Sequence, residues 1–285
     1  MSVVNYRRAS AITSRCSSPI IWGDCPTLQI MADSAKGFHI FDDFKNSVIP
    51  TEEAGRTALT NGLGNVFGDI NWYAYVESAL VADLALQADD DGVLMLDTEG
   101  TDDDVISITT GNNVCGVCKT PTSGQSTGWW FEARFKVSTV TNTDLGLFVG
   151  LAEPGQAKDG YILGAASALA DVDYVGFWIQ EADGDDLCVV YNEATSGTAQ
   201  AVHDAATLTA DTYVRMGMRY DVNSNKIKCY KDGVYIGTTY DIDVSSTNFP
   251  SATDMDLLIC VTSGAAGEDG DNLKIDSVRF AQTFE

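Results

Sequence analysis

The residues from Tyr213 to Gly237 constrain the fold more than any other stretch of this sequence. Apolar side chains alternate there with polar or small ones, and in the first segment the alternating apolar residues are Val214, Met216 and Met218. A period of two places successive side chains on opposite faces of a β-strand. Asp232-Gly233 is the sequence favoured by a two-residue type I′ hairpin turn. The stretch therefore predicts three antiparallel strands joined by tight turns, with one face buried.

The same alternation continues through most of the chain. Residues 129–137 alternate cleanly and place two tryptophans, Trp129 and Trp130, on opposite faces of one strand. Turn signals recur about every eight to twelve residues, which is typical of a β-sandwich. Residues 79–88 have the composition of a short helix. An apolar content of 45% is enough for one large core. We therefore expect an all-β body.

Three parts of the chain carry a family resemblance. The central stretch combines a strand ending in Tyr220-Asp221, a polar turn and a strand that runs into Asp232-Gly233. Together with the strand-like segments 38–44 and 272–280, it resembles the concanavalin A-like and laminin-G-like jelly-roll superfamily, whose final strand returns beside the first. The resemblance spans residues 38–285 and implies a concanavalin A-like jelly-roll β-sandwich. That fold hosts lectins, glycosidases, adhesion modules and virion proteins, so it does not fix the function.

The net charge of −24 is unevenly distributed. Residues 1–36 carry four basic and two acidic side chains, which gives +2, so residues 37–285 carry −26. An acidic surface repels phosphate, and we therefore expect no nucleic-acid partner. No run approaches the ~20 apolar residues that a membrane helix needs, so we expect no membrane insertion. The first residues lack the apolar core of a signal peptide, which favours assembly in a cytosol.

Residues 1–36 lack the strand-and-turn pattern, and we interpret them as an extended N-terminal arm on a jelly-roll body of residues 37–285. The arm has too few apolar residues to bury a core of its own, so a partner would have to order it. Tryptophan and arginine are enriched at binding hot spots. We expect the arm to dock on a partner through Arg7, Arg8, Arg15, Ile20, Ile21 and Trp22. The alternative is a terminus without a role.

Two carboxylates on one strand would indicate a glycosidase. The nearest approach to such a pattern is Glu181-Ala-Asp183-Gly-Asp185-Asp186. Gly184 interrupts the alternation, so a hairpin turn is the better interpretation. Neither His39 nor His203 lies in a nucleophile motif. We therefore expect no enzymatic activity.

Aromatic side chains beside polar groups could instead bind sugars without catalysis. Four residues are candidates for stacking on sugar rings: Trp72, Tyr73, Tyr75 and Trp130. Packing in a core or an interface would explain the same residues.

Acidic turns offer the hard oxygen ligands that calcium prefers. The resemblance also implies calcium, because related lectins carry it on loops at one rim. We take Asp269 and Asp271 as the leading candidate ligands. Solvated turns of an acidic protein would have the same composition.

The seven cysteines show no repeated spacing, and their number is odd, which is typical of reduced thiols. Three lie in apolar runs and are expected to be core residues: Cys188, Cys229 and Cys260. Cys115-Gly-Val-Cys118 has the spacing of a metal or redox pair but lacks further ligands. Cys16 and Cys25 could pair, but nothing in the sequence requires it.

An acidic jelly roll with a basic arm and no signal peptide resembles a tailed-bacteriophage virion protein of the capsid decoration or accessory kind. That resemblance implies a structural protein on the capsid surface, assembled in the host cytoplasm. Its partner would be the major capsid protein or another virion protein, and capsid symmetry favours a homotrimer. The alternative is a non-catalytic, lectin-like carbohydrate-binding module that attaches to host or surface glycans with the help of calcium.

Overall fold

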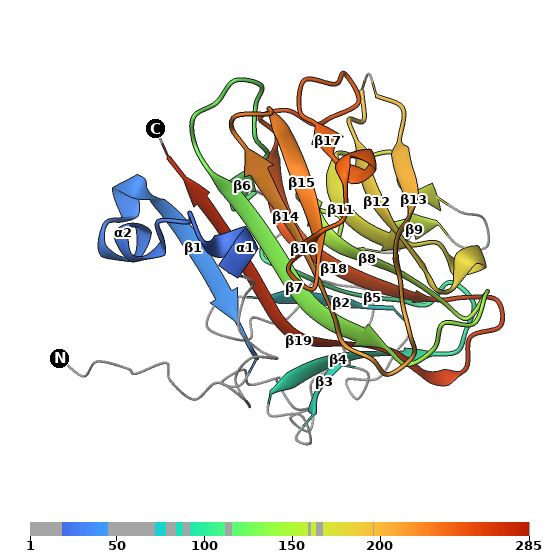
Figure 1. Ribbon diagram of the computed structural model, residues 1–285. Helices are drawn as coiled ribbons and strands as arrows, with labels where there is room; N and C mark the ends of the chain where they lie inside the picture. The colour runs from blue at the N-terminus through green and yellow to red at the C-terminus, as the bar shows by residue number, and fades with distance from the viewer. Residues whose placement is uncertain are drawn as a thin grey trace.

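The computed structural model describes residues 19–44, 72–77, 84–87, 92–111, 116–158, 161–163, 168–195 and 197–284. These residues form two large antiparallel β-sheets that stack face to face (Figure 1). The buried space between the sheets holds the main core of the protein.

The first sheet contains the first and the last strand of the chain. Its strands are β1 (Gly37–Asp42), β3 (Leu84–Gln87), β4 (Val93–Glu99), β7 (Trp129–Val137), β14 (Val214–Asp221), β15 (Lys226–Lys231), β16 (Val234–Tyr235), β17 (Ile242–Asp243) and β19 (Asp269–Thr283). Their spatial order is β16-β15-β14-β7-β19-β4-β3, with β1 beside β19 and β17 beside β15.

The second sheet is built largely from the middle of the chain. Its strands are β2 (Tyr73–Val76), β5 (Val105–Thr109), β6 (Cys118–Lys119), β8 (Leu145–Ala152), β11 (Tyr174–Ile179), β12 (Asp186–Asn192), β13 (Gln200–Thr207) and β18 (Asp254–Ser263). Their order is β13-β12-β11-β8-β18-β5-β2, with β6 beside β18. A separate small ribbon pairs β9 (Ile162–Leu163) with β10 (Ala168–Leu169).

Helical structure in the described part of the chain is confined to short segments. These are the helices α1 (Pro19–Trp22) and α2 (Thr27–Ala32) and the 3-10 turns η1 (Ser34–Lys36), η3 (Glu181–Asp183) and η4 (Thr238–Tyr240). The helix expected at residues 79–88 is not formed by 84–87, which are strand β3, and the rest of that segment lies outside the described residues. Because β3 pairs with β4 at the edge of the first sheet, strand pairing decides the conformation there. No helix among the described residues has the length and apolar character needed to cross a membrane.

The predicted three-stranded hairpin is confirmed in β14, β15 and β16. Asp232 and Gly233 both have positive φ angles, 49° and 79°, as a type I′ turn requires. The pairing of the first strand with the last is also confirmed, because Gly37 lies opposite Thr283 and Asp42 opposite Val278.

The segment Pro19–Lys36 lies on the outer face of the first sheet, the face turned away from the second sheet (Figure 1). Three of its side chains, Ile21, Trp22 and Ile30, cluster with three from the sheet, Trp130, Tyr230 and Ala281. Gly217 in β14 leaves room for this packing, because a Cβ there would lie 2.4 Å from Ile21 Cδ1. From Pro19 onward, the predicted arm therefore contacts this chain's own sheet, and residues 1–18 lie outside the described residues.

Candidate functional site

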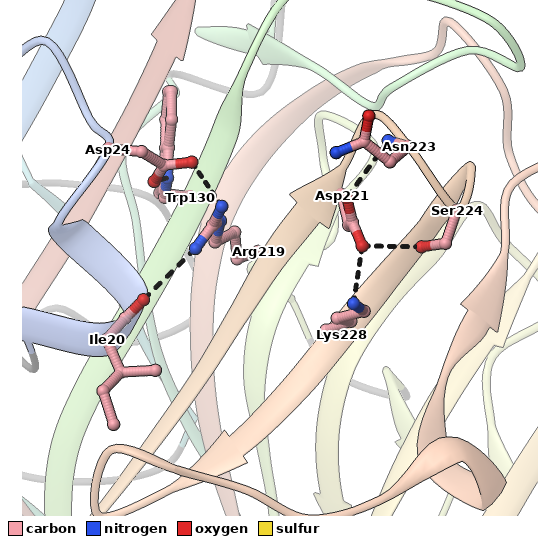
Figure 2. Close-up of polar contacts among 8 residues, drawn as sticks. All are labelled: Ile20, Asp24, Trp130, Arg219, Asp221, Asn223, Ser224 and Lys228. Carbon is pink, nitrogen blue, oxygen red and sulfur yellow. Dashed lines mark hydrogen bonds and ion pairs between the residues drawn. The ribbon is translucent and has the colours of Figure 1, made fainter.

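A groove of about 330 Å³ opens where the N-terminal segment meets the first sheet. Its walls come from residues distant in sequence, as Figure 2 shows for Asp24, Trp130 and Arg219. The lining residues are Asp24, Pro26, Ser126, Gly128, Trp130, Arg219, Tyr220, Asp221, Val222, Asn223 and Thr283. The groove thus combines an indole ring with charged, amide and hydroxyl groups.

Asp24 connects the N-terminal segment to the sheet. Its Oδ1 accepts a hydrogen bond from Trp130 Nε1 at 3.1 Å, and its Oδ2 forms an ion pair with Arg219 Nη2 (Figure 2). Arg219 Nη1 also donates to the carbonyl oxygen of Ile20 at 3.2 Å. The Asp24 side chain is still 50% exposed. Its carboxylate is therefore fixed in orientation by two donors while it remains open to a ligand.

The turn after β14 forms a second charged wall of the groove. Asp221 Oδ2 lies 2.5 Å from Lys228 Nζ and accepts a hydrogen bond from Ser224 Oγ at 2.9 Å (Figure 2). Hydrogen bonding to Lys228 lowers the pKa of Asp221 to about 2, with further contributions from Ser224 and the Asn223 backbone. Asp221 is therefore ionised at neutral pH and holds the turn in a defined conformation.

Two contacts hold the neighbouring loop against this turn. Asn225 Oδ1 accepts a hydrogen bond from Gly124 N, and Asn225 Nδ2 donates one to Ser123 Oγ, both at 2.9 Å. The Trp130 ring lies so close to Gly128 that a Cβ there would be 1.9 Å from Trp130 Cη2. Glycine is therefore required at position 128 if the indole is to remain at the groove floor.

The groove also offers polar groups that no described residue of the protein uses. Asn223 and Ser126 are exposed, and neither side chain makes a hydrogen bond with the described residues. Such amide and hydroxyl groups can donate to and accept from ligand hydroxyls. Together with the fixed Asp24 carboxylate, they form a site suited to a neutral, hydroxyl-rich ligand.

The expected docking residues of the arm have different environments. Ile21 and Trp22 are buried against the first sheet, and Trp22 Nε1 donates to Glu132 Oε2 at 3.0 Å. We expected these two side chains to dock on a partner, but their apolar surface is already covered by this chain. Ile20 is 57% exposed. The three arginines of the prediction, Arg7, Arg8 and Arg15, lie outside the described residues.

The four aromatic residues expected to bind sugar do not form one surface. Trp72 is fully buried and donates from Nε1 to Asp42 Oδ2 at 2.9 Å, so it belongs to the core. Tyr75 is also buried, and Tyr73 is only partly exposed beside it on β2. Trp130 is nearly buried but lines the groove. Only Trp130 among them lies at this site.

The expected calcium ligands lie at the beginning of β19. Asp271 Oδ2 accepts a hydrogen bond from Glu268 N at 2.8 Å, and the Asp271 carbonyl accepts one from Thr98 Oγ1. Both contacts join Asp271 to other groups of the protein, and the side chain of Asp269 lies outside the described part of the structure. Calcium binding there stays a prediction.

The acidic segment at 181–186 and the Cys-x-x-Cys segment are the remaining sequence candidates. Glu181 and Asp183 belong to turn η3 while Asp186 begins β12, so the hairpin interpretation is confirmed. Glu181 Oε1 accepts a hydrogen bond from Ala265 N at 3.0 Å. Cys118 is buried, and burial raises its pKa well above the ordinary value for a thiol. Its sequence partner Cys115 lies outside the described residues.

Asp256 on β18 gives the fold a predictable pH dependence. Burial raises the pKa of Asp256 from 3.8 to about 6, although Val117 N donates to its Oδ1 at 3.2 Å. Because the folded state holds this proton more tightly than the unfolded chain, stability falls as pH rises from about 4 to above 6. We expect Asp256→Asn to raise the free energy of unfolding by about 1 to 2 kcal/mol at about pH 8 and by little at about pH 4.

Urea unfolding at the two pH values measures this effect. Asp254→Asn is the matched control on the same strand, because its carboxylate is exposed. If Asp256→Asn raised the free energy of unfolding equally at both pH values, the buried carboxyl would not titrate as described.

Comparison with known proteins identifies the fold. No protein-family model matches the sequence, and no curated protein matches it. Among solved structures, the mixed-linkage glucan GH16 protein of Bacteroides ovatus in complex with its product has a TM-score of 0.50 and 16% identity, covering 85% of this chain and 99% of that one. A glycoside hydrolase family 16 endo-glucanase of the same organism gives the same values. Peanut lectin has a TM-score of 0.50 and 11% identity, covering 88% of this chain and 100% of that one.

These comparisons establish the fold. The chain has the concanavalin A-like jelly-roll β-sandwich that the sequence predicted. The expectation of no enzymatic activity is contradicted, because the same fold occurs in the two glycoside hydrolase family 16 structures. None of these neighbours indicates a bacteriophage virion protein.

Proposed function

We propose that this protein binds carbohydrate in the groove between the N-terminal segment and the first sheet. The observation that carries the proposal is the grouping of an oriented carboxylate, a guanidinium, an indole and an unused amide in one open groove. Protein–sugar contacts need such planar hydrogen-bonding groups beside an aromatic ring. The names of the fold neighbours, a lectin and a glucanase, support the same ligand class.

We expect Asn223→Ala to weaken glycan binding by about two- to tenfold, because the variant removes one neutral hydrogen-bonding side chain. Asn223 is exposed at the tip of the turn, so the fold should not change. The probe is a mixed-linkage glucan oligosaccharide measured by isothermal titration calorimetry, after a glycan array has been screened for other ligands. Release of reducing ends is followed in the same samples to detect hydrolysis.

Asn142→Ala is the matched control, because Asn142 is an exposed asparagine in the turn between β7 and β8 and does not line the groove. Its affinity should equal that of the unchanged protein. Binding that is insensitive to Asn223→Ala and to Arg219→Ala would place the sugar elsewhere. The absence of glycan binding throughout the array would refute the proposal.

A second proposal is the capsid decoration role. The observation that favours it is the exposure of large apolar side chains on the N-terminal segment, where Leu28 is 84% and Met31 72% exposed. The test is co-sedimentation of the full chain with assembled phage shells, compared with Leu28→Ser. Deleting residues 1–36 would be a poor test because it would also uncover the sheet beneath Ile21. A full chain that fails to sediment with shells would refute this role.

A further inference from the structure

We infer that Cys188, His203 and Asp186, with Asp183 beside them, form a binding site for a transition-metal ion such as Zn²⁺. The site lies across the strand pair β12–β13 of the second sheet, and none of its residues lines the groove described above. It is independent of the proposed sugar binding. Thiolate, imidazole and carboxylate are the three ligand types that zinc takes from proteins.

Two of the separations between the ligand atoms are already close to those that a metal ion requires. His203 Nδ1 lies 3.2 Å from Cys188 Sγ and 3.1 Å from Asp186 Oδ2. All three atoms lie within 4.8 Å of one another. At zinc bond lengths of about 2.0 to 2.3 Å, two ligands of a tetrahedral ion lie about 3.4 Å apart. The two separations at His203 Nδ1 therefore differ from this value by only a few tenths of an ångström.

Asp183 offers a fourth ligand atom, and the backbone of Asp204 orients the carboxylate of Asp186. Asp183 Oδ2, from turn η3, lies 3.9 Å from His203 Nδ1. Asp186 Oδ1 accepts a hydrogen bond from Asp204 N at 2.6 Å, which leaves Oδ2 directed at the cluster. Asp204 has a φ of 60°, and the pairing of β12 with β13 is irregular between Leu187 and Val189. A hydrogen bond that orients a ligating carboxylate in this way is common in metal sites.

The accessibility of the cluster suits a metal ion better than a nucleophile. Cys188 is fully buried at the base, while the side chains of His203 and Asp183 are 46% and 44% exposed. Burial, with contributions from Asp186, Asp183 and Asp204, raises the pKa of Cys188 to about 12. A thiol in that state is a poor nucleophile at neutral pH. A cation that displaces its proton would be attracted by the same three carboxylates.

Titration of the full-length reduced protein with Co²⁺ tests the inference. Co²⁺ takes the place of zinc and gives a thiolate charge-transfer absorption when a cysteine binds it. We expect one equivalent to produce that absorption and Zn²⁺ to abolish it. Cys188→Ser should remove the absorption, and His203→Gln should weaken Co²⁺ binding at least about tenfold. Affinity should rise by up to about tenfold per pH unit, because binding releases the thiol proton.

The chain supplies matched controls for the thiol and the imidazole ligands. Cys118→Ser changes a cysteine of the Cys-x-x-Cys segment, and His39→Gln changes the other histidine of the chain. Both variants should bind Co²⁺ like the unchanged protein, and circular dichroism checks that all four variants are folded. Absorption that survives Cys188→Ser but is lost in Cys118→Ser would assign the metal to the Cys-x-x-Cys segment. That result would overturn the inference, as would the absence of stoichiometric binding or full affinity in His203→Gln.

Discussion

Replacing Asp276 with alanine is expected to lower the free energy of unfolding by about 3 to 5 kcal/mol. Asp276 lies in β19 where the pairing with β7 is irregular, and only 3% of the residue is exposed. Its Oδ2 is 2.9 Å from Arg134 Nη1, and the guanidinium of Arg134 lies 4.0 Å from the centre of the Tyr213 ring. The substitution would leave a mostly buried guanidinium without its carboxylate. Urea unfolding at neutral pH, followed by circular dichroism, measures the loss.

An exposed ion pair of the same fold provides the control. Lys119 and Asp254 lie 3.3 Å apart with about 60% of each side chain exposed. Asp254→Ala should therefore change the free energy of unfolding by about 1 kcal/mol or less. If Asp276→Ala cost no more than Asp254→Ala, the pair between Arg134 and Asp276 would have the strength of a surface contact only.

Replacing Trp22 with alanine is expected to cost about 3 to 5 kcal/mol, as for other large buried aromatic residues. The guanidinium carbon of Arg279 lies 3.8 Å from the centre of the Trp22 ring. Trp22 also donates a hydrogen bond to the buried carboxylate of Glu132. The variant would therefore create a cavity and remove one donor from Glu132. Trp22→Phe should cost less, because it keeps an aromatic ring against Arg279.

Urea unfolding again gives the cost, and limited proteolysis reports on the N-terminal segment itself. Leu28→Ala is the control within the same segment, because Leu28 is 84% exposed and should contribute little. Faster cleavage of Trp22→Ala with an unchanged unfolding midpoint would contradict the prediction. It would mean that the segment detaches without cooperating with the sandwich.

The sequence predicts much of the sandwich because strand alternation and turn chemistry are local signals. The type I′ turn at Asp232-Gly233 and the buried inner faces of the strands follow from them. Alternation tells which side chains share a face, but it does not tell what covers that face. Trp130 points outward as expected, yet it is 4% exposed because the N-terminal segment covers it. The sequence did contain one signal that another segment packs there. Gly217 lies between two outward arginines in β14 and leaves space above the sheet.

The two candidate sites could not be found in the same way. The groove depends on the contact between Asp24 and Arg219, which are 195 positions apart, and no sequence pattern links them. Cys188 and His203 are only 15 positions apart. Their contact nevertheless depends on the irregular register between β12 and β13. No pattern in the intervening sequence predicts that irregularity.

The pairing of β1 with β19 has a consequence for synthesis of the protein. His39 and Arg279, which contact each other across these strands, are separated by 240 residues. Ribosomes add about 5 to 20 residues per second, so β1 waits on the order of 10 to 50 s for the strand that it joins. During that time Phe38, Ile40 and Trp22 lack the surface that later shelters them. The first strand to emerge is thus among the last to be secured, and in that interval the nascent chain is most exposed to chaperones and to aggregation.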